Sequence, residues 1–299
     1  MKIALFGGTG LIGTELVNCL NEKHRFILFT RNKTGIKDKL DNCEVIEISD
    51  NENNLIASLE DCDAIINLAG ESIASGRWTK KKKEAILNSR INTTKFVFNL
   101  IEKTKNKPKV YIAASAVGYY GNRYNEELNE VSSSGKDFLS NVTIQLENEV
   151  RHFEKLGVRT ILLRIGIVLS NKGGALPKIL LPIKLFIGGK LGAGNQWMPW
   201  IHINDLTRII EFCVINPING PVNAVSPNPV TNKEFTFAAA KLLKRPSFLS
   251  VPSFVLKFSL GEMSSILLGG QKAIPQKLNK ANFCFHYSSI HKALSDLLI

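Results

Sequence analysis

The sequence predicts an α/β protein with a doubly wound parallel sheet and a smaller C-terminal region. Three observations predict it. An apolar run at the N-terminus leads straight into a glycine-rich turn, strand-like and helix-like segments alternate through the first half, and glycine- and proline-rich connections interrupt that alternation after about residue 169. With 299 residues, 44% of them hydrophobic, the chain is long enough to bury a substantial core.

The glycine-rich turn at residues 7–13 reads Gly-Gly-Thr-Gly-Leu-Ile-Gly and follows the apolar run 3–6. This order predicts a strand, a tight turn and the start of a helix. Gly7 allows the sharp turn, Gly10 lets the backbone approach a pyrophosphate without an intervening Cβ, and Gly13 lets helix and strand pack closely. First-turn amides of that helix face the phosphates. We therefore expect a Rossmann fold with cofactor contacts from Gly7, Thr9, Gly10, Leu11, Ile12 and Gly13.

The remaining elements follow from apolar runs bounded by turn residues. Strands are expected at residues 2–6, 25–30, 44–48, 64–68, 110–114 and 159–163. Helices are expected at 11–21, 80–103 and 138–156, the last ending at Gly157 as a C-cap. Right-handed crossovers between such strands give a parallel sheet with helices on both faces.

The domain organisation is expected to change where the alternation stops. The nucleotide-binding domain should span residues 1–169, and segments of a substrate region should span 170–245. Within the latter, a strand at 200–203 and a helix at 205–214 make residues 200–225 candidates to return to the main sheet. Residues 246–299 are expected to form a small C-terminal domain that closes with 283–287 and a helix at 288–298.

Charge and composition limit the partners. A net charge of +12 favours anionic partners, but the densest basic run, residues 80–83, has no interleaved aromatic residues, so we expect no nucleic acid. We expect no leader at the N-terminus, and no apolar run is long enough to span a bilayer, so we expect a cytoplasmic protein with no membrane partner. We also expect a monomer or homodimer and a small-molecule substrate. The five cysteines lie far apart, which argues against a metal site or a disulfide framework.

The residues after the second strand indicate which dinucleotide is bound. NAD-selecting sheets place an acidic residue there to accept hydrogen bonds from the ribose hydroxyls. This chain has Thr30-Arg31-Asn32-Lys33, whose cations suit a 2′-phosphate. We therefore expect NADP, with Thr30 and Arg31 as contacts. The alternative is that Arg31 only points to solvent.

A second turn, Asn67-Leu68-Ala69-Gly70, follows the fourth strand. Further motifs are Glu71-Ser72-Ile73, Arg77-Trp78, Ser89-Arg90 and the segments 115–121, 197–205 and 228–232. With them the chain resembles the extended short-chain dehydrogenase/reductase superfamily. Within it, the chain is similar to the atypical epimerase family proteins of the YfcH/SDR39U1 type, which are NAD-dependent epimerase/dehydratase-like and carry a DUF1731-like C-terminal domain. The resemblance implies that the second turn lines the adenosine and ribose side of the cofactor. We add Glu71, Arg90 and Arg164 as cofactor contacts.

The superfamily implies a catalytic tyrosine with a lysine four residues later, which lowers the tyrosine pKa. No Tyr-x-x-x-Lys occurs in this chain. If Glu147 is aligned with the glutamate that usually follows the motif, Leu139 and Thr143 take the tyrosine and lysine positions. Ser115, at the end of the fifth strand, is what remains of the usual set, where it would polarise a substrate carbonyl.

A substitute catalytic set is therefore sought among Ser115, Tyr119 and Arg90. Tyr119 would supply a phenol, and Arg90 would bind an anion unless it pairs with Glu71. Four other residues in the motifs are candidates for ligand contact, but each also has an ordinary structural explanation. This is core packing for the two tryptophans, a structural role for the histidine and helix capping for the aspartate. The four residues are Trp197, Trp200, His202 and Asp205.

Two functions remain open at this point. One is an NADP-binding epimerase/dehydratase-like oxidoreductase of unknown substrate with atypical catalytic residues. The other is a non-catalytic, NADP(H)-dependent binding or regulatory module, which agrees with the cell-division-related label that some family members carry. The absence of the Tyr-Lys pair favours the module, whereas Ser115 favours the enzyme.

Overall fold

The computed structural model describes residues 1–34, 36 and 43–298. Its centre is a seven-stranded sheet in the order β3-β2-β1-β4-β5-β7-β12, in which every pair is parallel. The order reverses between β1 and β4, as in a doubly wound fold, so the predicted fold class is confirmed. The strands are β1 (Lys2–Phe6), β2 (Arg25–Thr30), β3 (Glu44–Glu47), β4 (Ala64–Asn67), β5 (Val110–Ala116), β7 (Arg159–Ile165) and β12 (Gly220–Ala224).

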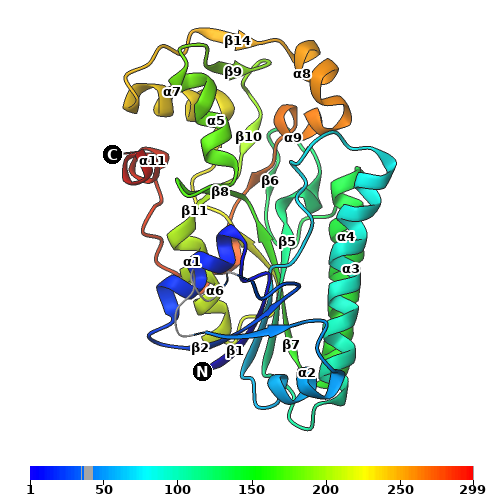
Figure 1. The fold of residues 1–299 in the computed structure, drawn as a ribbon. Coiled ribbons are helices and arrows are strands. Elements are labelled where there is room, and N and C mark those ends of the chain that lie inside the picture. The colour runs from blue at the N-terminus through cyan, green and yellow to red at the C-terminus, as the bar shows by residue number, and fades with distance from the viewer. Residues whose placement is uncertain (35, 37–42, 299) are drawn as a thin grey trace.

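Helices cover both faces of the sheet because its strands are apolar on both sides (Figure 1). In β1, Ile3 and Leu5 pack with one set of helices while Ala4 and Phe6 pack with the other. The first set is α1 (Leu11–Leu20) and α6 (Ile203–Ile215). The second set is α2 (Glu52–Leu59), α3 (Lys80–Lys103) and α4 (Phe138–Val150).

Helix α3 has the predicted bounds because Thr79 caps its start, where its hydroxyl accepts a hydrogen bond from the Lys82 amide. The helix expected at 138–156 is α-helical only to Val150; η2 (Arg151–Leu156) continues it as a tighter 3-10 segment. Gly157 ends it in the left-handed conformation, as predicted. Helix α2, capped by the Asn51 side chain, was not predicted.

A second lobe lies beyond the carboxyl ends of β5 and β7 (Figure 1). Three strand pairs frame it, β8 with β11, β9 with β14 and β10 with β13, and its core packs α5, α7 and α11 around Trp200 and Phe235. The expected strand at 200–203 therefore pairs with β8, and β12 is the strand that joins the main sheet. The elements are β8 (Ile167–Leu169), α5 (Ala175–Lys184), β9 (Gly189–Leu191), β10 (Trp197–Met198), β11 (Trp200–His202), β13 (Val230–Thr231), α7 (Asn232–Leu242), β14 (Leu249–Val251) and α8 (Ser253–Leu260).

The C-terminal part packs against both halves of the protein. Leu278 and Phe283 join the core beneath α1 and α6, whereas Ile290, Leu294 and Leu297 join the core of the second lobe. Residues 283–287 form no helix or strand. The elements are η3 (Gly261–Ser264), α9 (Ser265–Leu268), β15 (Lys272–Ala273), α10 (Gln276–Lys280) and α11 (Ile290–Leu298), with β15 paired to β6 (Glu127–Leu128).

Across the described part of the chain, no helix is both long and apolar enough to cross a bilayer. Nor do the residues that the structure describes bring together three or more His, Cys, Asp or Glu side chains in a group that could hold a metal ion.

Candidate functional site

The β1–α1 turn has the shape that its glycines predict. Gly7 has φ +78°, and a Cβ on it would lie 2.7 Å from the Ala69 amide nitrogen; a Cβ on Gly13 would lie 2.6 Å from the Gly7 carbonyl oxygen. Packing within the chain thus requires both glycines. Gly10 differs, because its φ is −78° and a Cβ there would meet only the Gly7 oxygen, at 3.4 Å. Among the described residues, the space beside Gly10 therefore stays open.

The start of α1 is suited to an anion. Its N-cap residue, Gly10, offers no side-chain acceptor, and the first turn holds no acidic residue. Within the described chain the first-turn amides therefore have no side-chain partner, and the helix dipole adds positive potential at the same end. Thr9 and Gly10 are exposed, and Leu11 and Ile12 are half-buried. A pyrophosphate fits this turn.

At the end of β2, Thr30 and Lys33 are already engaged. The Thr30 hydroxyl donates to the Asn32 carbonyl at 3.1 Å, and the Lys33 ammonium lies 3.0 Å from an Asp50 carboxylate oxygen. Arg31 is exposed and forms no ion pair within the described residues. Of the described cations at this strand end, Arg31 is therefore the one without an ion pair.

The turn after β4 is fixed by buried polar contacts. Asn67 is 4% exposed; its Oδ1 accepts from the Ala69 amide at 3.1 Å and its Nδ2 donates to the Tyr111 hydroxyl at 2.8 Å. The Leu68 amide donates to the Phe6 carbonyl at 2.9 Å. Asn67 thus shapes the turn, and the backbone of residues 68–70 faces the glycine turn of β1, where Gly7 and Ala69 almost touch.

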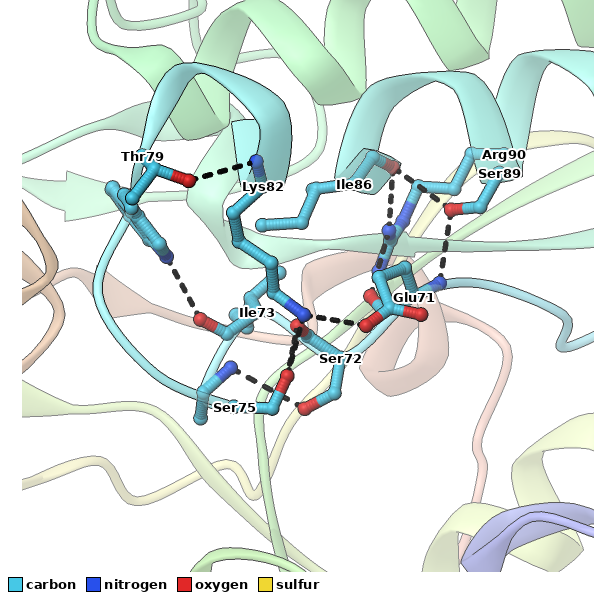
Figure 2. A network of polar contacts seen from close by, with 11 residues as sticks. Glu71, Ser72, Ile73, Ser75, Thr79, Lys82, Ile86, Ser89 and Arg90 are labelled. Atoms are coloured by element: carbon cyan, nitrogen blue, oxygen red, sulfur yellow. Dashed lines mark hydrogen bonds and ion pairs between the residues drawn. The ribbon is translucent and has the colours of Figure 1, made fainter. Parts of the chain in front are cut away.

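The loop between β4 and α3 is held by a polar network (Figure 2). Lys82 Nζ lies 2.5 Å from Glu71 Oε1 and 2.6 Å from Ser75 Oγ, and this contact lowers the pKa of the Glu71 carboxyl. The Glu71 amide donates to Ser89 Oγ at 2.9 Å. The carboxylate of Glu71 therefore pairs with Lys82.

Arg90 approaches the same loop from α3 but does not pair with the Glu71 carboxylate. Its Nη1 donates to the carbonyls of Ile86, at 2.8 Å, and Glu71, at 3.1 Å (Figure 2). A Cβ on Gly70 would lie 3.0 Å from the guanidinium carbon, so this glycine makes room for Arg90. Nε and Nη2 have no partner among the described residues, and desolvation lowers the pKa of the guanidinium. These two nitrogens remain able to bind a ligand anion.

Ser115, by contrast, lies in a buried network that joins β5, α4 and β7. Its hydroxyl donates to Glu147 Oε1 at 2.8 Å. Arg164 binds the same carboxylate with two nitrogens, Nε to Oε1 at 2.9 Å and Nη2 to Oε2 at 2.8 Å. Arg164 and Glu147 are each 2% exposed. The single hydroxyl proton of Ser115 is therefore donated to Glu147, so the Ser115 oxygen can only accept a hydrogen bond from a ligand.

Arg164 also determines how the two neighbouring tyrosines are used. Its Nη1 donates to the Tyr120 hydroxyl at 3.0 Å, and Tyr120 donates to Asn223 Oδ1 at 2.7 Å. Burial raises the pKa of Tyr120 to about 12. The ring of Tyr119 stacks on the Arg164 guanidinium, whose Cζ lies 3.4 Å from the ring centroid. The Tyr119 hydroxyl has no partner in the described residues. Of the two phenols, Tyr119 is the one left for a ligand.

The aligned positions on α4 carry no acid or base. Leu139 packs on Gly118, and the Thr143 hydroxyl donates to the Ser140 carbonyl at 2.8 Å. Glu147 entered the sequence argument only as an alignment marker, and its link to Ser115 was missed. The signal available was a single acidic residue on the buried face of α4.

The remaining sequence candidates have structural roles. His202, not Asp205, is the N-cap of α6, where its Nδ1 accepts from the Asn204 amide at 3.1 Å. Asp205 is fully buried and accepts the amides of His286 and Tyr287, at 2.9 and 2.8 Å. Trp200 is fully buried in the core of the second lobe, whereas Trp197 is half-buried at its edge, where its indole donates to Asn125 Oδ1 at 2.9 Å.

Comparisons with known proteins agree with this geometry. The model of the NAD dependent epimerase/dehydratase family matches residues 3–225, and that of a domain of unknown function, DUF1731, matches residues 251–297. Epimerase family protein YfhF of Bacillus subtilis is 42% identical over 301 residues, covering 100% of this chain and 98% of the relative.

Two solved structures extend the comparison. The human epimerase family protein SDR39U1 with NADPH has a TM-score of 0.89, 34% identity and 99% coverage of each chain. A UDP-glucuronic acid 4-epimerase of Bacillus cereus, with UDP-glucuronic acid and NAD, has a TM-score of 0.77 at 18% identity, with 99% of this chain and 98% of that chain covered, and shows the fold alone. This protein therefore belongs to the NAD dependent epimerase/dehydratase family, as an epimerase family protein with a C-terminal DUF1731 domain.

Proposed function

We propose that this protein binds NADP(H) at the carboxyl edge of its sheet and uses it in an oxidoreductase or epimerase reaction with residues other than the usual Tyr-Lys pair. The observation that carries the choice of cofactor is Arg31. It stands where an NAD-selecting sheet places an acid, and it is exposed without an ion pair in the described part of the chain. A guanidinium suits a 2′-phosphate, and the human relative solved with NADPH supports the same choice.

Different residues at the carboxyl edge of the sheet bind different parts of the dinucleotide. First-turn amides of α1 hold the pyrophosphate, Arg31 holds the 2′-phosphate, and the backbone of residues 67–70 lies along the adenosine ribose. Thr30 leaves the set of proposed contacts, because its hydroxyl is bonded to Asn32. Arg90 binds a phosphate or carboxylate through Nε and Nη2. Arg164 leaves the set of proposed cofactor contacts, because its donors are used by Glu147 and Tyr120. When bound, the nicotinamide supplies a hydride donor or acceptor.

Replacing Arg31 by aspartate is expected to weaken NADPH binding about 10- to 100-fold relative to NADH, because a charge-assisted contact to the 2′-phosphate is lost and a repulsive one replaces it. Titration of each cofactor by calorimetry measures the ratio. Arg25→Asp is the matched control, since it makes the same charge change at the opposite end of β2, where Arg25 pairs with Glu44. An unchanged NADPH to NADH ratio in Arg31→Asp would refute the assignment of the 2′-phosphate site.

For the chemistry, Tyr119 is the proposed proton donor and Ser115 accepts a hydrogen bond from a substrate hydroxyl. Tyr119→Phe keeps the ring that stacks under Arg164 and removes only the phenol oxygen. We expect turnover to fall about 10²- to 10⁴-fold with NADPH affinity unchanged. For aldehydes and quinones the measurement is consumption of NADPH, by its near-ultraviolet absorbance. For nucleotide sugars it is the appearance of the epimer by chromatography, because epimerisation returns the hydride and consumes no cofactor. Equal turnover by the variant and the wild type would exclude Tyr119 as the donor.

A second function, the non-catalytic NADP(H)-dependent module, is favoured by one observation: the hydroxyl proton of Ser115 is directed to Glu147, so it is not available to polarise a substrate carbonyl. The same assays separate the two. Tight NADPH binding with neither oxidation of NADPH by any compound class nor epimerisation of any nucleotide sugar would support the module.

A further inference from the structure

Exposed apolar side chains are concentrated on the second lobe. Of fourteen large apolar residues exposed in the described chain, ten lie within residues 175–199 and 231–260. Phe186, Phe248 and Phe258 are 54%, 81% and 85% exposed. A monomeric soluble protein rarely gathers so many, which indicates a binding surface.

The same two segments are strongly basic. They hold eight Lys and Arg and a single acid, Glu234. The Glu234 carboxylate is committed to the cap of α7, where it accepts the amide and hydroxyl of Thr231. Within the described residues none of the eight cations forms an ion pair, in contrast to Lys82 or Lys33 on the first domain. The eight are Lys178, Lys184, Lys190, Lys233, Lys241, Lys244, Arg245 and Lys257.

Apolar and basic residues meet where β9 pairs with β14. Leu249 lies opposite Gly189 in this pair, and the Arg245 guanidinium carbon lies 4.3 Å from the ring centroid of Phe186. The two chain segments thus form one surface, which Figure 1 places at the end of the second lobe farthest from β1. We define the β9–β14 surface as Leu185, Phe186, Ile187, Arg245, Phe248 and Leu249.

Two residues of this region adopt a backbone conformation that their side chains do not favour. Phe186 has φ +64° and Lys244 has φ +53°, in the left-handed region that glycine or asparagine normally occupies. Neither side chain is buried, so packing in the core does not account for a phenylalanine or a lysine there. Strain of this kind is retained where the side chain has a task.

We propose that the β9–β14 surface docks on an anionic lipid bilayer, with its apolar side chains in the acyl boundary. Arg245 and the exposed lysines next to the surface in sequence, Lys184 and Lys244, bind the lipid phosphates. Aliphatic and aromatic side chains beside unpaired Lys and Arg are the chemistry of a membrane-surface site. A second copy of this chain fits less well, because a twofold interface would place these cations against their own equivalents. Single-stranded nucleic acid also fits less well, since Leu185, Ile187 and Leu249 offer no ring for base stacking.

The sequence predicted no membrane partner because no apolar run is long enough to cross a bilayer. The exposed residues of this surface come from two segments about sixty residues apart, 185–187 and 245–249, so no sequence window contains them together. A surface site needs only a few side chains on one face.

The test is co-sedimentation with vesicles of phosphatidylcholine, with or without phosphatidylglycerol. Wild-type protein is expected to bind the anionic vesicles and to lose binding as salt shortens the screening length from about 10 Å at 0.1 M to about 3 Å at 1 M. Phe186→Gly is expected to weaken binding about tenfold or more, because one buried aromatic side chain is lost. The same change relieves a left-handed phenylalanine, so its melting temperature should not fall.

Tyr124→Gly is the matched control. Tyr124 is also an aromatic residue with positive φ, +51°, and is 79% exposed, but it lies outside the β9–β14 surface. Its replacement should leave vesicle binding unchanged. The proposal is overturned by wild-type protein that ignores anionic vesicles, by equal losses in both variants, or by a Phe186-dependent dimer or oligothymidylate complex in place of vesicle binding.

Discussion

Replacing Arg164 by alanine is expected to lower the free energy of unfolding by about 3–5 kcal/mol, because it leaves the carboxylate of Glu147 buried without its partner. The pair is 2% exposed on both sides and makes two contacts of 2.8 and 2.9 Å. Arg164 also fixes the Tyr120 hydroxyl, so its loss would leave a second buried group short of a donor. Urea denaturation of wild type and variant gives the difference.

An exposed ion pair in the same protein provides the control. Arg123 pairs with Glu126 at the surface, and Arg123→Ala should cost less than about 1 kcal/mol. The double variant Arg164→Met with Glu147→Leu should recover much of the loss, since both charges are then absent from the core. An Arg164→Ala variant as stable as Arg123→Ala would mean that the pair does not join β7 to α4.

The second large effect concerns two glycines of the β1–α1 turn, which the structure distinguishes. Gly7→Ala combines a φ of +78° with a Cβ 2.7 Å from the Ala69 nitrogen, so backbone must move; we expect a loss of about 1–3 kcal/mol and of NADPH binding. Gly10→Ala meets nothing closer than 3.4 Å, so the fold should keep its stability. NADPH affinity should still fall about tenfold or more, because the methyl group fills the space of the pyrophosphate.

Thermal unfolding and NADPH titration of both variants test this contrast. Gly157→Ala separates strain from steric overlap, since Gly157 has φ +74° but nothing within 4 Å of an added Cβ. It should lose about 1 kcal/mol and no NADPH affinity. A Gly10→Ala variant that binds NADPH like the wild type would show that the pyrophosphate does not lie against this turn.

Local patterns predicted much of the fold. The apolar run 3–6 and the cap before residue 80 specify β1 and α3 through short-range chemistry alone. Helix α2 was not predicted because Glu52–Leu59 is short and has only two buried residues, Leu55 and Leu59. The change from α4 to the 3-10 segment η2 after Val150 was missed for a different reason: it leaves no distinct composition.

The sequence predicted where the candidate site lies better than it predicted which side chains bond to one another within it. The glycine turn and the position of Arg31 after β2 could be predicted because each depends on a few consecutive residues. The link from Ser115 to Glu147 and Arg164 depends on strands and a helix that are 32 and 17 residues apart and that only the folded sheet brings together. The partner of Glu71 was likewise unpredictable, because Lys82 and Arg90 both lie on the facing helix and the rotamers decide which one binds.

The buried carboxylate of Asp205 has a consequence for how this gene can be divided. It holds the amides of residues 286 and 287, while Leu278 and Phe283 complete the core beneath α1 and α6. A protein ending after the matched segment 3–225 would therefore leave Asp205 with Arg208 but without two of its donors, and it would uncover an apolar patch. The segment 3–225 is therefore not an independent folding unit, and it should not fold stably when it is produced without the C-terminal segment.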